Sequence, residues 1–421
     1  MALQWVLRAT AVVVGAAYLQ SNGLPEWASR SIGRVHIDKS KLVRWADSPA
    51  LNNGACVVDQ TADACEDVVV HFASSTAFVA CGDPRGRTYW YPPAGQRDAA
   101  GRAAVSSFRE KLFKHDIKTG KTVELELRGV DGDFVTHGLD LWASPEDPTK
   151  VHLFAVRHAR DGDSISIFSH TLGTDVAELV RDVKHANIRT ANGVAAVGEL
   201  YVDPHPLSPL RCPMYSELLT VGSEFYLTND HYFLNDPWRT IEEKLGPWSW
   251  TTDVQYCDAS SELITCQKVA GSFVVANGIA VWEDRLFVGD SQNGTVTIFQ
   301  LRPDKGADIQ GQVELGAAAD NIKIDPTTGD LVVSIFPTLE NLPLYLANVE
   351  KLGKDLRVPV AALRLPKSSG YKPELLFYDD GGVLSDMTAM AVDPYNQVLI
   401  GAAVLQYGGF AVCKMGHSKT A

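Results

Sequence analysis

The pattern of apolar and polar positions repeats in short segments from about residue 60 onward. Each segment holds about five to seven apolar or alternating residues, which is the length of a β-strand and shorter than a typical helix. Gly, Asp, Asn or Pro closes each segment, as expected of turns. Helical periodicity is scarce, so the sequence predicts an all-β protein. The clearest segments are residues 67–80, 151–156, 225–227, 278–288, 322–335 and 390–400.

Three of these segments share one arrangement, in which an apolar strand, a polar turn and a second apolar strand follow each other. The turns read EDR within residues 278–288, DPTTGD within residues 322–335 and DPYNQ within residues 390–400. Units of roughly 40 to 50 residues with several strands each are typical of propeller blades, which leave few exposed sheet edges. The length of 421 residues would by itself suggest about two or three domains. The repeat instead predicts one closed propeller of about six to eight blades.

Three stretches interrupt this pattern. Residues 203–219 (DPHPLSPLRCPMYSELL) are rich in proline and predict a long surface loop or lid. Residues 84–109 lack clear alternation and predict a loop or an excursion between blades. Residues 236–250 hold three tryptophans and the sequence EEK, and they predict a short helix.

The N-terminus carries an apolar run at residues 9–19 (ATAVVVGAAYL), preceded by Arg8. A membrane-spanning helix needs about 20 apolar residues, whereas this run has the length of a signal-peptide core. A helix that docks onto the folded protein is the alternative. We expect residues 1–26 to be a signal peptide or signal anchor, and residues 27–421 to form a single domain. This assignment predicts a protein of the secretory pathway, either extracellular or attached to a membrane.

Charge and cysteine content narrow the classes of partner and compartment. The net charge is −13 and basic runs are absent, which argues against a nucleic-acid partner. Seven cysteines are compatible with an oxidising compartment, and their odd number leaves at least one thiol unpaired in a monomer. Cys257 and Cys266 could face each other across a hairpin, although buried apolar thiols are the alternative. Asn293-Gly294-Thr295 is a glycosylation sequon in a secreted chain and otherwise an Asn-Gly hairpin turn.

Common catalytic motifs are missing from the sequence. It has no P-loop, dinucleotide fingerprint, HExxH or CxxC motif, and no Gly-x-Ser-x-Gly elbow of a serine hydrolase. Isolated carboxylates and amides instead interrupt apolar segments, as in VVANGIAV and AADNIKI. They are Glu66-Asp67, Asn192, Asn229-Asp230, Asn277 and Asp320-Asn321.

Oxygens of this kind are the ligands that calcium prefers, in sets of about six to eight at about 2.3–2.6 Å. A propeller could bring one ligand from each blade to its central channel, so that residues far apart in the sequence converge. The simpler interpretation is that Asn277-Gly278 forms a turn and that Asp320-Asn321 starts a strand. From spacing alone, a shared metal site therefore stays a hypothesis.

Two histidines form a second candidate group. His137 lies in FVTHGLDLW, and His158 ends the next predicted strand, VHLFAVRH. Adjacent strands of one blade could place the two imidazoles together, where one orients the other or relays its proton. The alternative is two separate, partly exposed histidines.

Several of these segments, in this order, resemble the serum paraoxonase and arylesterase family, whose members are calcium-dependent six-bladed propellers that hydrolyse lactones. The resemblance runs from about residue 56 to residue 413 and implies an all-β, six-bladed β-propeller. Residues 203–219 look like an insertion relative to the animal enzymes. The matching motifs are CEDVVV at 65–70, FVTHGL at 134–139, FAVRH at 154–158, ANGVAAVG at 191–198, YLTNDHYFLNDP at 226–237, VVANGIAV at 274–281 and DNIKIDPTTGDLVV at 320–333.

The resemblance also implies roles for individual residues. His137 and His158 fall on the family's proton-transfer dyad. Cys56 and Cys413 fall on its disulfide between the chain ends. The positions of the catalytic calcium are Glu66, Asn192, Asn277, Asp320 and Asn321.

A second, structural calcium is also implied, although less completely. Asp67 and the carbonyl of Leu139 match its positions, but Gly193 stands where that site usually has an aspartate. Losing a charged ligand should weaken the second calcium or move it onto other oxygens.

The implied activity is the calcium-dependent opening of lactones, with promiscuous hydrolysis of aryl esters. Calcium would polarise the substrate carbonyl and stabilise the oxyanion while a base removes a proton from the attacking water. His137, oriented by His158, is the first candidate for this base, and Glu66 and Asp320 are the others.

Two further classes stay open at this stage. One is a non-catalytic propeller that binds a ligand or a membrane partner, and the other is a hydrolase of sugar lactones or phosphotriesters. In animal relatives the N-terminal segment can contact lipid, and residues 9–19 could do likewise.

Overall fold

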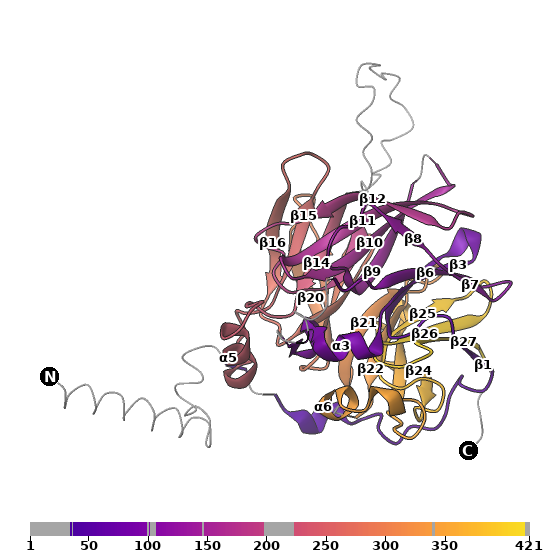
Figure 1. Cartoon of the computed structure of the whole chain (residues 1–421). Helices are drawn as coiled ribbons and strands as arrows, with labels where there is room; N and C mark the ends of the chain where they lie inside the picture. Colours follow the sequence, from indigo (N-terminus) through magenta and orange to yellow (C-terminus); the bar gives the residue numbers. More distant parts are fainter. Residues whose placement is uncertain are drawn as a thin grey trace, which may run out of the picture.

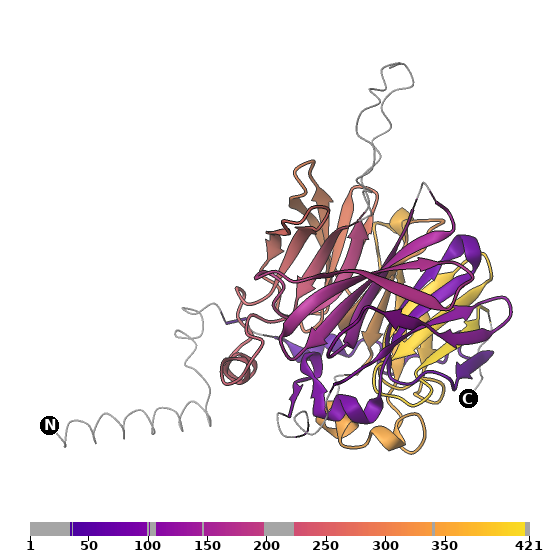
Figure 2. The same ribbon diagram turned by 45° about the horizontal axis from the view of Figure 1, so that its top comes forward.

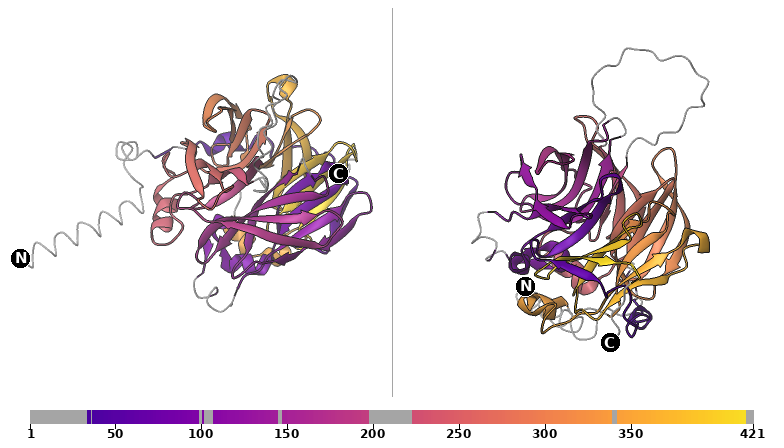
Figure 3. Two further views of the ribbon diagram at one scale, coloured as in Figure 1. Left: turned by 90° about the horizontal axis from the view of Figure 1, so that it is seen from above. Right: turned by 90° about the vertical axis from the view of Figure 1, so that its right-hand side faces the viewer.

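The computed structural model describes residues 34–35, 37–98, 101, 107–144, 147–197, 223–338 and 342–416. The apolar run at 9–19, the proline-rich stretch at 203–219 and Cys212 lie outside these residues. Six mainly antiparallel sheets of four or five strands are arranged around a common centre (Figure 1, Figure 3). The predicted six-bladed β-propeller is thereby confirmed.

Each sheet is one blade, and its strands follow one another outward from the centre (Figure 2). The first blade holds β2 (Cys65–His71), β3 (Thr76–Cys81), β6 (Lys111–Asp116) and β7 (Lys121–Glu124). The second holds β9 (Val135–Ala143), β10 (Lys150–Ala159), β11 (Gly162–Thr171), β12 (Val176–Val183) and, parallel to β12, β8 (Glu126–Arg128). The third holds β13 (Ala191–Val197), β14 (Glu224–Asn229), β15 (Asp253–Asp258) and β16 (Thr265–Gly271).

The remaining blades repeat this plan. The fourth holds β17 (Ala276–Trp282), β18 (Arg285–Asp290), β19 (Thr295–Leu301) and β20 (Ala307–Glu314). The fifth holds β21 (Ala318–Ile324), β22 (Leu331–Phe336), β23 (Val360–Leu365) and β24 (Glu374–Asp379). The sixth holds β25 (Met387–Asp393), β26 (Val398–Ala403), β27 (Phe410–Lys414) and β1 (Cys56–Asp59). The three strand–turn–strand repeats of the sequence are the first hairpins of the fourth, fifth and sixth blades.

Helices are short and lie between strands. They are α3 (Pro84–Tyr89), α5 (Trp238–Leu245) and α6 (Leu342–Leu346), with 3-10 turns η1 (Lys39–Leu42), η2 (Phe72–Ser74), η3 (Pro92–Ala94), η4 (Val349–Lys351) and η5 (Lys367–Ser369). The short helix expected within residues 236–250 is present as α5. No helix among the described residues is long and apolar enough to cross a membrane.

Residues 84–109 differ from the expected loop between blades. They connect β3 to β6 within the first blade, and they contain α3 and a two-stranded ribbon of β4 (Trp90–Tyr91) and β5 (Gln96–Arg97). Asp83 caps α3 by accepting a hydrogen bond from the backbone N–H of Arg85, and Pro84 occupies the first turn. This Asp-Pro start is a local helix signal that the lack of alternation concealed.

The hydrophobic core is divided into wedges between neighbouring blades. One buried cluster joins each adjacent pair of sheets, including the sixth and the first. Because an inner strand is covered on both faces, it can be apolar without alternation; all seven residues of β2 and all seven of β25 are buried. The innermost strands β2, β9, β13, β17, β21 and β25 contact one another in a closed ring.

The two ends of the described chain close this ring. β1 pairs with β27 in the sixth blade, in a register that places Cys56 opposite Cys413. These two cysteines form a disulfide, as the resemblance implied. Cys257 and Cys266 form a second disulfide across the β15–β16 hairpin, and Cys65 and Cys81 form a third, which the sequence did not predict.

Candidate active site

All six innermost strands are irregular at the same level of the channel. Each carries a β-bulge, in which its pairing with the second strand of the blade shifts by one residue. A bulge removes residues from the regular ladder and redirects their side chains. The residues at these bulges are Glu66 in β2, His137 and Gly138 in β9, Asn192 and Gly193 in β13, Asn277 and Gly278 in β17, Asp320 and Asn321 in β21, and Thr388 in β25. Five of the polar residues singled out in the sequence therefore form one ring: Glu66, Asn192, Asn277, Asp320 and Asn321.

The glycines of these bulges are required by the close approach of neighbouring strands. A Cβ atom on Gly138 would lie 2.5 Å from the carbonyl oxygen of Asn192, and one on Gly278 would lie 2.4 Å from that of Asp320. Each glycine thus lets the next blade pack directly against the bulge. Asn277-Gly278 is a bulge within a strand and not the turn that its sequence also allowed.

Three oxygens of this ring are buried without a hydrogen-bond partner. They are Oε2 of Glu66, Oδ1 of Asn192 and Oδ1 of Asn277. A buried acceptor that is left unsatisfied costs about 1–3 kcal/mol, so a cluster of them indicates a missing cationic or donating group.

The other ring members lie beside these three. Asn321 donates from Nδ2 to Oε1 of Glu66 at 2.8 Å, and the Asn277 amide donates to Asp320. Among the described residues, no group of three or more His, Cys, Asp or Glu side chains is arranged for a metal ion. The ring combines two carboxylates with three amides, a hard-oxygen donor set that suits calcium.

The ring concentrates buried negative charge. Burial raises the pKa of Asp320 well above its usual range, and the charges of Glu66 and Asp386 raise it further. Asp386 lies just before β25, is 1% exposed, and has a left-handed φ of 62°. Carboxylates confined together in this way need a proton or a cation between them.

His137 begins a chain of buried polar groups that leads away from the ring. Its Nε2 lies 3.4 Å from Oε1 of Glu66, and its Nδ1 lies 3.2 Å from Nε2 of His158. Nδ1 of His158 lies 2.9 Å from Oδ1 of Asp163. Oδ2 of Asp163 accepts from the backbone N–H of Ala191 at 3.0 Å. The two histidines are 4% and 1% exposed, so they are neither separate nor on the surface.

The contacts of these groups favour one pair of tautomers. Nδ1 of His158 and Oδ1 of Asp163 are close enough for an ion pair but are not aligned as a hydrogen bond, and the negative charge of Asp163 favours a proton on Nδ1 of His158. Nε2 of His158 then accepts from Nδ1 of His137, which leaves Nε2 of His137 to gain or lose a proton at the ring. Burial lowers the pKa of His137, but the charge and hydrogen bond of Glu66 outweigh it, and the net effect raises that pKa. Burial raises the pKa of Glu66, but the charge and hydrogen bond of His137 outweigh this effect and lower that pKa below its usual value.

An apolar cluster lies over the histidines. Tyr91, in β4, has its ring centroid 5.5 Å from that of His137 and 6.4 Å from that of His158. Its hydroxyl is buried without a hydrogen-bond partner, and the guanidinium of Arg87 lies 4.4 Å from the centre of its ring. Trp90, Tyr345 and Leu346 belong to the same cluster, so side chains from α6 and from the β4–β5 ribbon cover this end of the channel.

Comparison with known proteins gives a consistent family relationship. The family described as Arylesterase matches residues 213–408. Serum paraoxonase/arylesterase 2 of Rattus norvegicus is 26% identical over 301 residues, which cover 70% of this chain and 74% of that protein. Serum paraoxonase/lactonase 3 of Rattus norvegicus is 24% identical and covers 80% of this chain and 82% of its own length. The chain is similar to serum paraoxonases, arylesterases and lactonases.

Solved structures also align with the chain. The luciferin-regenerating enzyme covers 88% of this chain and 95% of its own, with 12% identity and a TM-score of 0.46. Regucalcin, described as a calcium-binding protein, of Agrobacterium tumefaciens covers 86% of this chain and 93% of its own, with 11% identity and a TM-score of 0.43.

The second calcium position implied by the paraoxonase/arylesterase resemblance differs from the first. Leu139 donates its backbone N–H to Oδ2 of Asp67 at 2.8 Å, so the two predicted members do lie together. The ammonium of Lys323, which is in β21, contacts both of them. Burial raises the pKa of Asp67 to about 6, and the positive charge of Lys323 limits this rise. Sequence reasoning did not single out Lys323, because a lysine in the alternating stretch IKID is typical of a solvent-exposed strand face.

Several other residues at and around the ring were also missed. Asp163 sits in β11, where no motif marks it, and Thr388 donates from Oγ1 to the carbonyl of Glu66 at 2.6 Å. The predicted pair Asn229-Asp230 divides into two roles. Asn229 accepts from the backbone N–H groups of Arg189 and Thr190 and is structural. Asp230 lies close enough to His137 for each charge to influence the other.

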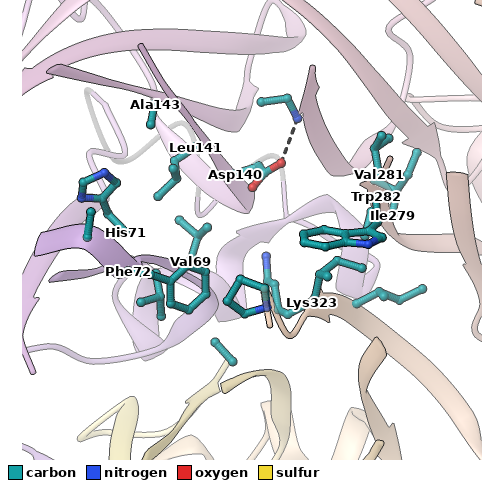
Figure 4. Close-up of a pocket in the computed structure, with 18 residues that line it drawn as sticks. Val69, His71, Phe72, Asp140, Leu141, Ala143, Ile279, Val281, Trp282 and Lys323 are labelled. Carbon is teal, nitrogen blue, oxygen red and sulfur yellow. Dashed lines mark hydrogen bonds between the residues drawn. The ribbon is translucent and has the colours of Figure 1, made fainter. Parts of the chain in front are cut away.

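A pocket opens at the opposite end of the channel from the ring. It has a volume of about 390 Å³ and is lined by the far ends of the inner strands. Figure 4 shows Lys323 and Asp140 in its centre, with Trp282 on one side and His71 and Phe72 on the other. The dashed line in Figure 4 is the bond from the backbone N–H of Ala196 to Oδ2 of Asp140, at 2.8 Å. The ring residues do not line this pocket, so the two ends of the channel are chemically distinct.

Proposed function

We propose that this protein is a calcium-dependent hydrolase that opens lactones and also cleaves aryl esters. The family relationship supports an enzyme that hydrolyses esters or lactones. The observation that carries the finer proposal is the ring itself. Three unpartnered buried oxygens, two of them amide oxygens, belong to bulges of the inner strands beside a pair of histidines that ends at a carboxylate. A propeller that only bound a ligand would have no need of this combination.

The ring residues are proposed to hold the calcium ion. Its ligands would be Glu66, Asn192, Asn277, Asp320 and Asn321, which come from four different blades. When bound, calcium supplies a Lewis acid that polarises an ester carbonyl and stabilises negative charge on its oxygen. The amides of Asn192 and Asn277 are uncharged, so their oxygens can serve as ligands without adding to the repulsion among the carboxylates.

The histidine chain is proposed to move the proton of the attacking water. Nε2 of His137 faces the ring, and the tautomer set by Asp163 and His158 leaves this atom able to accept. A positioned base of this kind contributes about 10²- to 10⁴-fold to a hydrolytic rate. Glu66 and Asp320 remain the alternative bases, because each lies at the same ring.

The surroundings of the ring bear on the substrate. Tyr91 and the apolar cluster around it supply a nonpolar surface next to His137, suited to the alkyl or aryl part of an ester. The hydroxyl of Tyr91 can donate to a substrate oxygen without giving up another bond, because it has no partner among the described residues.

A panel of aliphatic, aromatic and sugar lactones, assayed with calcium and with excess chelator, tests the proposal. We expect turnover of aliphatic or aromatic lactones that chelation abolishes. In His137→Gln, kcat should fall about 10²-fold or more while calcium binding is retained. The matched control is His115→Gln, which changes a buried histidine of β6 that contacts Thr122 outside the channel.

The outcomes separate the alternatives. Full activity in excess chelator would reject the calcium requirement. Wild-type rates in His137→Gln on every lactone would reject His137 as the base and leave Glu66 or Asp320. Turnover confined to sugar lactones or phosphotriesters would replace the substrate class, and calcium binding without any turnover would favour a binding protein.

We also propose that the protein enters the secretory pathway. Three disulfides support an oxidising compartment. Asn293 is exposed in the turn between β18 and β19. Residues 1–26, and any lipid contact through them, lie outside the described residues; mass spectrometry of the mature N-terminus and of Asn293 would test both assignments.

A further inference from the structure

Lys323 sits on the oxygens that the resemblance assigns to a second calcium. Its Nζ lies 2.8 Å from Oδ1 and 2.9 Å from Oδ2 of Asp67, and 3.1 Å from the carbonyl oxygen of Leu139. Asp67 is 3% exposed and the Lys323 side chain 14%. An ammonium has three N–H donors, and the structure gives it three acceptors.

We infer that the Lys323 ammonium is a built-in cation that replaces the second calcium, so that the protein binds calcium at the ring only. Calcium would need the same oxygens at about 2.3–2.6 Å, a position that the ammonium fills. Adding calcium beside Lys323 would place three positive charges next to the single charge of Asp67. The geometry therefore supports lysine or calcium at this position, and not both.

Gly193 points to the same conclusion from another blade. A Cβ atom there would lie 3.0 Å from the carbonyl oxygen of Asn277 and 3.0 Å from Cγ2 of Ile279, so this chain leaves little room for an aspartate. One carboxylate has thus been exchanged for glycine while a lysine has been added nearby. Each departure makes the site more positive by one charge, and together they match the two charges of the calcium ion that the lysine replaces.

The position of Lys323 ties together the strands that carry the ring. Asp67 follows Glu66 in β2, and Leu139 lies two residues beyond His137 in β9. Lys323 lies two residues beyond Asn321 in β21. One covalently attached cation therefore crosslinks the first, second and fifth blades directly beneath the proposed calcium ligands. This crosslink does not depend on the calcium concentration around the protein.

Asp140 is the other carboxylate close to this lysine. It lines the pocket at the far end of the channel together with Lys323 (Figure 4). Burial raises the pKa of Asp140, and the positive charge of Lys323 limits this rise. If Lys323 were shortened to alanine, Asp67, Asp140 and the carbonyl of Leu139 would surround an open, water-accessible space. That set of oxygens could accept a divalent cation.

The experiment counts calcium per chain by elemental analysis after gel filtration in calcium-containing buffer. Lys323→Ala should bind one calcium ion more than the wild type. Lys323→Met, which removes the charge but keeps the volume, should bind no additional ion. Lys305→Ala, which removes a half-buried lysine paired with Glu224 outside the channel, should match the wild type.

The inference about Lys323 rests on the proposed function only in naming calcium as the ion. Different experimental results would therefore reject the inference and the proposed function. If the wild type binds no calcium but Lys323→Ala gains one ion, the replacement of the second calcium by Lys323 holds, while calcium at the ring and the calcium requirement of the hydrolase are both rejected. An unchanged count in Lys323→Ala would overturn the inference. If Lys323→Ala does not fold, the double variant Glu66→Gln/Asp320→Asn decides: it should retain no calcium, and one remaining ion would show that the lysine position is occupied by metal.

Discussion

Replacing Asp163 by asparagine should disable the histidine chain without touching a calcium ligand. The carboxylate uses one oxygen for Nδ1 of His158 and the other for the backbone N–H of Ala191. Asparagine has one acceptor oxygen, so its amide nitrogen must face one of these two donors. If the amide nitrogen faces His158, the imidazole of His158 must carry its proton on Nε2 and donate from that atom. Nδ1 of His137 then becomes the acceptor, and Nε2 of His137 carries the proton and can no longer act as a base.

The size of the effect follows from the contact that is lost. The atoms of His158 and Asp163 are 2.9 Å apart, and the side chains are 2% and 1% exposed. The two atoms are close but not aligned as a hydrogen bond, so the value of about 1.5–3 kcal/mol for a hydrogen bond to a charged group is an upper bound for this contact. Because about 1.4 kcal/mol changes a rate tenfold, we expect kcat to fall about 10-fold and by no more than about 150-fold. The KM should stay near its wild-type value, since Asp163 does not face the ring.

Steady-state kinetics on one aliphatic lactone, together with calcium titration, measures this prediction. Asp290→Asn is the matched control, because Asp290 is also a buried aspartate that accepts backbone N–H groups, those of Val274 and Val275, outside the histidine chain. The control should keep its kcat within about threefold.

Two results would refute the reasoning. Wild-type kcat in Asp163→Asn would mean that the tautomer of His158 does not matter for turnover. A loss of kcat that is accompanied by an equal loss of calcium affinity would mean that Asp163 acts on the ring itself and not through the histidines.

Two further predictions concern packing and pH. Gly278→Ala should lower the free energy of unfolding, measured in urea, by about 1–3 kcal/mol and should weaken calcium binding, because its Cβ would meet the Asp320 carbonyl at 2.4 Å. Gly311→Ala in β20 is the control, because a Cβ there has nothing within 4 Å, and it should change neither quantity. Equal effects of the two substitutions would contradict the packing argument. Burial raises the pKa of Asp290 to about 6, above its value in the unfolded chain. The stabilising contribution of Asp290 is therefore fully present below about pH 4 and is lost as the pH rises through 6. The free energy of unfolding should fall by roughly 3 kcal/mol over this range. Urea midpoints at pH 5 and pH 7.5 should therefore differ more for the wild type than for Asp290→Asn, and identical differences would show that Asp290 is not responsible.

The sequence predicted those parts of the molecule that depend on local patterns. The first hairpins of three blades were visible as an apolar strand, a polar turn and an apolar strand, and Cys257 and Cys266 were visible as a facing pair. The family resemblance added positions that no local pattern could bring together, such as Glu66 and Asn321, which are 255 residues apart and 2.8 Å from each other.

What escaped prediction depends on contacts across the ring. Asn277-Gly278 has the composition of a turn, and only the carbonyl of Asp320 in the next blade makes it a bulge. Lys323 looks like a solvent-exposed strand residue until Asp67 and Leu139, from two other blades, provide its acceptors. A single sequence contains no signal for these partners, because the closure of the ring places them together.

The ring and the position of Lys323 directly beneath it both bring buried carboxylates together, but they differ in the number of oxygens that a cation must satisfy. At the lower position, Asp67 and the carbonyl of Leu139 offer three acceptors in all, which the three donors of one lysine can satisfy. At the ring, five side chains from four blades supply oxygens, three of them without any other partner. No lysine can donate to so many acceptors, whereas calcium takes about six to eight oxygens and leaves a position for a substrate. A fixed ammonium is therefore adequate where the cation only holds strands together, whereas the proposed hydrolysis would need an exchangeable ion that can also contact a substrate carbonyl.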